Sequence, residues 1–186
     1  MLKAKHIQQR IQNCLSLAAL SPCLRRQFGC VVIDPESNVI LSEGYNGGLR
    51  GGTSVCGDKA LCSRELLGIT SGEKLEVGCV HAEQNAIYNA VRLGTSLMGS
   101  WFIINGEPCR ICAKAIVQVG AECVICVGGV YDTDNGLNTL RKHSVNVKII
   151  DGDLESFDYK DLITPPLPLF QVTRDVSNSP FQRDPS

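Results

Sequence analysis

The sequence lacks an excess of charge of either sign. Lys and Arg number 18 against 19 Asp and Glu, so the formal net charge is -1. A chain with this balance has no overall basic field that would hold a polyanion such as duplex DNA or tRNA. We therefore expect no nucleic-acid partner, although a local basic pocket for a single phosphate is compatible with the balance.

Long apolar runs are also missing. No stretch of the 186 residues approaches the roughly 20 apolar residues that span a bilayer. The opening segment, MLKAKHIQQR, contains no apolar core of the kind found in secretory signals. We therefore expect a cytoplasmic protein without a membrane partner.

Cysteine, in contrast, is abundant, with ten residues. A disulfide framework is not expected, because the cytosol keeps thiols reduced. Four of the ten lie among Leu, Val and Ile and are typical of small apolar core residues: Cys14, Cys30, Cys123 and Cys126. The other six lie near turns, Gly, Pro or polar residues and are candidates for metal ligation or catalysis: Cys23, Cys56, Cys62, Cys79, Cys109 and Cys112.

The first part of the chain predicts a helix followed by a hairpin. Apolar residues at helical spacing predict a helix over 3–20. Two β-rich runs, 29–34 and 39–45, flank a turn segment that begins at Pro35 and predict two paired strands. Residues 46–78 then form a long loop with one short helix around 62–67, and a loop of this length is usually functional.

The second part of the chain alternates between segments with the apolar spacing of a helix and segments with the composition of a strand. Helices are expected over 82–93, 109–119 and 136–142, and strands over 101–105, 123–127 and 145–150. This alternation predicts one α/β domain over 1–163, a sandwich with a mixed sheet of about five strands. Residues 164–186 contain five of the eight prolines and predict a loosely packed tail.

Two segments combine residues that can bind a metal and move a proton. His81 and Glu83 open one predicted helix, and Pro108 precedes Cys109 and Cys112 at the start of the next. A Cys-x-x-Cys pair alone is also typical of a redox dithiol or half of a zinc knuckle, and His-x-Glu alone has little meaning. Together, one imidazole and two thiolates predict a zinc site with a fourth position open for water, which is the catalytic kind. Glu83 would lie near the ion without binding it, as a proton carrier must.

The same residues match the zinc-deaminase signature, His-x-Glu followed by Pro-Cys-x-x-Cys. The sequence from His81 to Ile87, the Gly44-Tyr45-Asn46-Gly47 segment and Tyr131 also resemble the deoxycytidylate deaminases. The resemblance implies a three-layer αβα sandwich of the cytidine deaminase-like kind. It further implies hydrolytic attack at C4 of cytosine, with Glu83 delivering protons to N3 and to the departing amine.

Substrate contacts are also implied by this resemblance. The backbone N–H of Ala82 would hold the pyrimidine O2, and Asn46 would hold a sugar hydroxyl. Arg26 is the first candidate for the phosphate, with Arg25 and Arg50 as alternatives, and each is equally typical of a solvated surface charge. Tyr131 would cap the sugar-phosphate side or simply pack within its loop.

A second, structural zinc is a further implication, because several members of the resembled family bind one with cysteines in similar places. The candidate ligands are Cys23, Cys56, Cys62 and Cys79. Four thiolates could fix the long loop, although they could equally be four unrelated, partly buried thiols.

The leading hypothesis is therefore a zinc-dependent hydrolase that converts dCMP to dUMP and ammonia and so supplies thymidylate synthesis. The alternatives within the same chemistry are a modified dCMP, cytidine, a riboflavin-pathway pyrimidine or tRNA adenosine as substrate. A non-catalytic zinc module on the same fold is a third class, which the presence of Glu83 disfavours. The resemblance also implies a homo-oligomer, namely a hexamer, and allosteric regulation by dCTP and dTTP.

Overall fold

The computed structural model describes residues 2–51, 62–69, 79–128, 136–151, 154 and 157–162. A mixed sheet of five strands lies at its centre, in the order β2-β1-β3-β4-β5. The strands are β1 (Gly29–Ile33), β2 (Ile40–Tyr45), β3 (Trp101–Ile104), β4 (Cys123–Val127) and β5 (Asn146–Ile150). β1 is antiparallel to β2 and β3, whereas β3, β4 and β5 are parallel. The predicted mixed sheet is confirmed.

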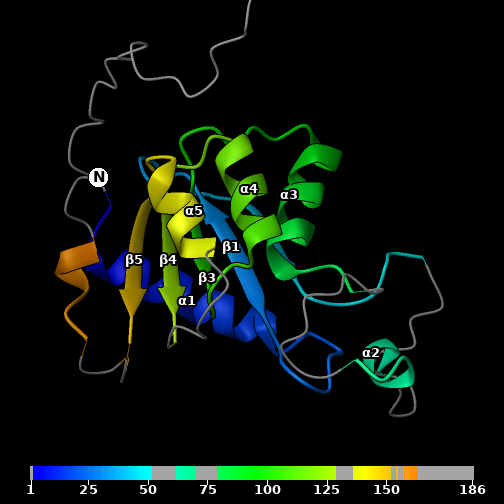
Figure 1. Ribbon diagram of the computed structural model, residues 1–186. Helices are drawn as coiled ribbons and strands as arrows, with labels where there is room; N and C mark the ends of the chain where they lie inside the picture. The colour runs from blue at the N-terminus through cyan, green and yellow to red at the C-terminus, as the bar shows by residue number, and fades with distance from the viewer. Residues whose placement is uncertain are drawn as a thin grey trace, which may run out of the picture.

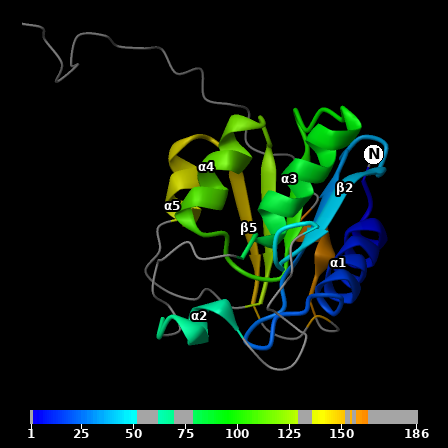
Figure 2. The same ribbon diagram turned by 90° about the vertical axis from the view of Figure 1, so that its right-hand side faces the viewer.

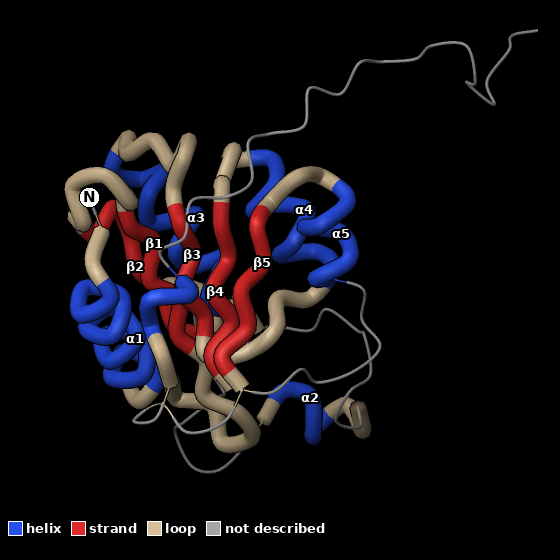
Figure 3. The backbone as a smooth tube through the Cα atoms, turned by 90° about the vertical axis from the view of Figure 1, so that its left-hand side faces the viewer, coloured by secondary structure: helices blue, strands red, loops and turns tan. Residues whose placement is uncertain are grey.

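Helices cover both faces of this sheet (Figures 1 and 2). α1 (Ala4–Ala18) and the 3-10 helix η1 (Tyr159–Leu162) lie on one face. α3 (Ala82–Leu93), α4 (Arg110–Gln118) and α5 (Gly136–Lys142) lie on the other. The tube in Figure 3 shows the strands between these two helical layers, so the three-layer αβα sandwich is confirmed.

The central strands are apolar on both faces because each face is covered. In β1, Cys30 and Val32 pack against the layer of α3 and α4, while Val31 and Ile33 pack against α1. The four cysteines expected in the core, Cys14, Cys30, Cys123 and Cys126, are buried.

Gly44 is the point of closest approach between the sheet and the helix that follows the long loop. A Cβ atom at Gly44 would overlap the backbone of Ala86 and Ala82 in α3. The missing side chain therefore lets β2 lie directly against the first turns of α3. This contact sets the position of the residues at the N-terminus of α3.

The short helix α2 (Ser63–Leu66) confirms the helix expected around 62–67 and lies apart from both layers in all three views. In the part of the chain that the structure describes, no helix is long and apolar enough to cross a membrane. Cys56, Tyr131 and the tail over 164–186 fall outside the described residues.

Candidate metal centre and substrate pocket

The N-termini of α3 and α4 meet at one place. His81 is the N-cap residue of α3 and Cys109 is the N-cap residue of α4. The backbone of Val80 pairs with Gly47 just after β2, and the His81 N–H donates to Oε1 of Gln84. The Cys112 N–H donates to Sγ of Cys109, which closes the first turn of α4. These contacts fix the direction in which the imidazole and the two thiols point.

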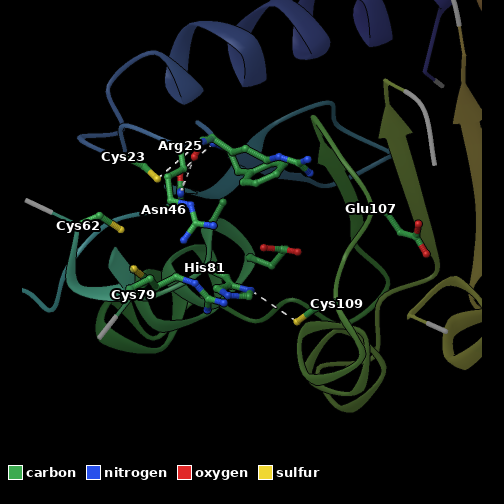
Figure 4. Close-up of a pocket in the computed structure, with 13 residues that line it drawn as sticks. Cys23, Arg25, Asn46, Cys62, Cys79, His81, Glu107 and Cys109 are labelled. Carbon is green, nitrogen blue, oxygen red and sulfur yellow. Dashed lines mark hydrogen bonds between the residues drawn. The ribbon is translucent and has the colours of Figure 1, made fainter. Parts of the chain in front are cut away.

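The three predicted ligands converge. Nδ1 of His81 lies 3.5 Å from Sγ of Cys109 and 3.5 Å from Sγ of Cys112, and Figure 4 shows His81 directed at Cys109. Among the described residues, His81, Cys109 and Cys112 are the one group of His, Cys, Asp or Glu with the geometry to hold a metal ion. Tetrahedral zinc with Zn–S of about 2.3 Å and Zn–N of about 2.0–2.1 Å requires N···S separations of about 3.5 Å. The two N···S distances therefore fit a zinc ion held by His81, Cys109 and Cys112.

The electrostatics also favour a cation. The hydrogen bond from the Cys112 thiol lowers the pKa of Cys109 to about 4, with His81 contributing in the same direction. The same hydrogen bond and burial raise the pKa of Cys112. A divalent ion binds the thiolate form of both cysteines, so its binding would release their protons.

Glu83 lies in the first turn of α3 and is only 5% exposed. Burial raises the pKa of its carboxyl group. A raised pKa makes a carboxyl group a better proton acceptor, as a group that transfers protons to a substrate requires. Glu83 lines the same cavity as His81 and Cys109 but is not part of the ligand group.

The metal centre opens into a cavity of about 320 Å³ (Figure 4). Its lining combines the metal centre with three arginines, Arg25, Arg26 and Arg64, and three further cysteines, Cys23, Cys62 and Cys79. The remaining lining residues are Phe28, Asn46, Ala82, Glu83 and Glu107. A cavity with a metal centre, a buried acid and several cations is suited to a small anionic substrate.

The predicted substrate residues Ala82, Asn46 and Arg26 all line this cavity. The amide of Asn46 also binds backbone: Nδ2 donates to the carbonyl of Arg26 (3.0 Å), and Oδ1 accepts from the N–H of Phe28 (2.8 Å). Asn46 thus supports the loop that contains Arg26, and its amide keeps one N–H and one lone pair for a ligand. Arg50 is not among the lining residues, and its guanidinium donates to Oδ1 of Asn89.

Three of the four cysteines proposed for a second zinc, Cys23, Cys62 and Cys79, line the cavity and lie on one side of the view in Figure 4. The fourth, Cys56, lies outside the described residues. Burial alone would raise the pKa of Cys62, but the N–H groups of Glu65 and Arg64 and the side chain of Arg25 lower it overall. These three sulfurs are not within common ligand distance in the described part of the chain.

Sequence reasoning missed Phe28, Arg64 and Glu107 as lining residues. Phe28 lies two residues after Arg26, and Glu107 directly precedes Pro108, so both are close in the sequence to residues that were predicted to belong to the site. Arg64 lies in the four-residue helix α2, which is too short for a pattern of apolar residues to indicate which way a side chain points.

The fold and the His-Cys-Cys centre define an α/β protein of the cytidine deaminase-like class with a zinc site of the catalytic type. A family model described as "Cytidine and deoxycytidylate deaminase zinc-binding region" matches residues 4–128. The chain belongs to this family.

The relatives of this chain include several deoxycytidylate deaminases. That of Enterobacteria phage T4 is 30% identical over 136 residues, which cover 56% of this chain and 68% of the phage protein. That of Homo sapiens is 35% identical over 109 residues, which cover 58% of this chain and 57% of the human protein. The matches thus span about half to two thirds of the length of these curated relatives.

A solved structure resembles nearly the whole fold. The crystal structure of dCMP deaminase from the cyanophage S-TIM5, in complex with dCMP and dUMP, matches with a TM-score of 0.68 at 25% identity. The match covers 81% of this chain and 100% of the cyanophage chain.

Proposed function

We propose that this protein hydrolyses dCMP to dUMP and ammonia. The observation on which this proposal rests is the cavity that His81, Cys109 and Glu83 share with three arginines. A metal centre beside a buried acid suits hydrolysis, and the arginines suit a substrate with a phosphate. The relatives named deoxycytidylate deaminase and the cyanophage enzyme with dCMP and dUMP support this substrate.

A zinc ion held by His81, Cys109 and Cys112 would lower the pKa of a coordinated water to around 7 and polarise it for attack at C4 of the pyrimidine. Glu83 transfers the two protons of the attacking water in turn: it accepts the first and delivers it to N3 of the base, then accepts the second and delivers it to the amino group, which leaves as ammonia. The raised pKa of Glu83 suits this role, because the carboxyl group must both gain and lose a proton in each turnover.

The substrate contacts remain part of the proposal. The N–H of Ala82 holds O2 of the pyrimidine, Asn46 binds a sugar hydroxyl and Arg26 contacts the phosphate, each from a position on the cavity wall. Tyr131 is proposed to cap the sugar-phosphate side from a segment outside the described residues.

We also propose that Cys23, Cys56, Cys62 and Cys79 hold a second, structural zinc ion. The presence of Cys23, Cys62 and Cys79 on one cavity supports the proposal. The lowered pKa of Cys62 supports it as well, because zinc binds the thiolate form.

The broader assignments implied by the family are proposals too. They are a homohexameric assembly, regulation by dCTP and dTTP, and a place in the cytoplasm. Light scattering and activity measured with each effector would test the first two.

The decisive experiment is ammonia release from purified protein with a panel of dCMP, CMP, deoxycytidine, cytidine, a 5-substituted dCMP, a riboflavin-pathway pyrimidine and tRNA. We expect the highest kcat/KM on dCMP. A higher kcat/KM on any other member of the panel would show that dCMP is not the preferred substrate, without contradicting the proposed metal chemistry.

A further inference from the structure

Arg64 enters the active-site cavity from a segment remote from the other two arginines. Arg25 and Arg26 precede β1, whereas Arg64 belongs to α2, in the described segment 62–69. Arg26 is exposed and Arg64 is half-buried. A half-buried guanidinium interacts more strongly with an anion than an exposed one, because solvent screens it less.

Arg25 holds this segment against the cavity. Its Nη1 donates to the carbonyl of Ile69 (3.4 Å), and its guanidinium also donates to the thiol of Cys62. Cys62 directly precedes α2 and Ile69 follows it by three residues, and both are buried, at 4% and 8% exposed. One side chain therefore binds residues on both sides of the helix that contains Arg64.

The backbone of Arg64 is part of the same arrangement. The Ile69 N–H donates to the Arg64 carbonyl (2.8 Å), so the residue that Arg25 binds is itself bonded to Arg64. Displacement of Ile69 would move Arg64. Arg25 is thus placed to act through Arg64, with its own donors directed at protein groups.

The charged side chains that line the cavity favour the binding of an anion. The three arginines face two acidic side chains, Glu83 and Glu107. The three guanidinium groups outnumber the two carboxyl groups, so the lining has an excess of cations. A phosphate monoester has a charge of about -1.5 to -2 at neutral pH and can accept paired hydrogen bonds from a guanidinium.

We propose that Arg64 contacts the phosphate of the nucleotide and sets the preference for a nucleotide over a nucleoside, with Arg25 as the positioning residue that holds Arg64 in place. This inference rests on the proposed function, since it takes a pyrimidine nucleoside monophosphate as the substrate.

The test compares kcat/KM on dCMP with kcat/KM on deoxycytidine in the zinc-loaded enzyme. Loss of a charge-assisted contact of about 1.5–3 kcal/mol should lower this ratio roughly 10- to 100-fold in Arg64→Ala, mainly through KM for dCMP. Arg64→Lys should recover part of the ratio, because it keeps the charge but loses the paired geometry. Arg50→Ala is the matched control and should keep the wild-type ratio, because Arg50 does not line the cavity.

Arg25→Ala should also lower the ratio of kcat/KM on dCMP to kcat/KM on deoxycytidine. The double variant Arg25→Ala/Arg64→Ala should have a ratio no lower than that of Arg64→Ala alone. Additive decreases in the ratio would overturn the positioning role of Arg25.

Two outcomes would overturn the role of Arg64 while leaving the proposed function intact. One is a wild-type ratio in Arg64→Ala, and the other is an equal decrease in kcat/KM on both substrates in the Ala and Lys variants. Failure of the wild-type enzyme to deaminate dCMP would overturn both.

Discussion

Nδ1 of His81 lies 3.5 Å from Sγ of Cys109, although the two residues are 28 positions apart in the chain. The chain between them forms α3, crosses to β3 and returns to the N-terminus of α4. Each residue caps its helix, so the direction of each side chain is fixed by the local backbone. The fold therefore places the imidazole and the thiol at a separation suited to one metal ion.

Removal of one ligand should cost metal and activity together. Cys109→Ala or Cys112→Ala leaves two of the three ligands, which cannot hold or activate the ion properly. Metal analysis and ammonia release should fall in parallel, whereas Cys126→Ala, a change at a core thiol, should keep the metal. Unchanged zinc at this centre in Cys109→Ala would contradict the ligand assignment.

Glu83→Gln should separate metal binding from catalysis. The change keeps the shape of the side chain and leaves the three ligands intact, but it abolishes proton transfer. Turnover should fall roughly 100- to 10,000-fold, while zinc at the His-Cys-Cys centre stays at about one equivalent per chain. Glu43→Gln, at an exposed position on β2, is the matched control and should retain activity. Wild-type turnover in Glu83→Gln would exclude Glu83 as the proton carrier.

Gly44→Ala should destabilise the fold, because the new methyl group would overlap backbone atoms of Ala86 and Ala82, which cannot move aside as a flexible side chain can. Overpacking of this kind costs about 1–3 kcal/mol in the free energy of unfolding, and urea denaturation would measure it. Gly47→Ala is the control, because its Cβ would meet Pro22 at 3.5 Å, an ordinary contact. Equal stability of the two variants would show that β2 and α3 can separate at no cost.

Much of the fold follows from the sequence pattern. Three predicted elements begin and end at the residues observed in the structure: the helices over 82–93 and 136–142 and the strand over 123–127. In each of them the pattern of apolar residues extends over the whole element. The metal centre was also predictable, since His81, Cys109 and Cys112 occupy a fixed spacing around two helix starts.

Contacts made by irregular segments were not predictable in the same way. Arg64 lines the cavity, and Arg25 donates to the carbonyl of Ile69, 44 positions away in the chain. No local sequence pattern encodes such a contact. The sequence also did not indicate the two hydrogen bonds that join the amide of Asn46 to the backbone of residues 26 and 28. Both are tertiary interactions between loops, and loops have no periodicity from which to infer them.

The proposed second zinc ion predicts the metal content of the wild-type protein. We expect about two equivalents per chain, one at each site, and the loss of one equivalent in Cys62→Ser. Cys123→Ser is the matched control, because Cys123 is buried in the core and remote from the cavity. A zinc content of one equivalent per chain in carefully purified wild-type protein would show that these four cysteines are ordinary thiols: Cys23, Cys56, Cys62 and Cys79.

Selectivity for the phosphate should be large in the wild-type enzyme. The guanidinium groups of the cavity would bind the phosphate of a nucleotide, but they have no anion to bind when a nucleoside enters. Such a site discriminates strongly between a nucleotide and a nucleoside. We predict that kcat/KM for dCMP exceeds that for deoxycytidine by at least roughly a hundredfold, or about 2.7 kcal/mol. Arg26→Ala should narrow this difference, mainly by weakening binding of the nucleotide, because the backbone of residue 26 stays held by Asn46. Steady-state kinetics on both substrates would measure the effect, with Arg50→Ala as the control. Comparable efficiencies in the wild type would reject a nucleotide as the substrate, whereas a full difference retained in Arg26→Ala would remove only Arg26 from the phosphate site.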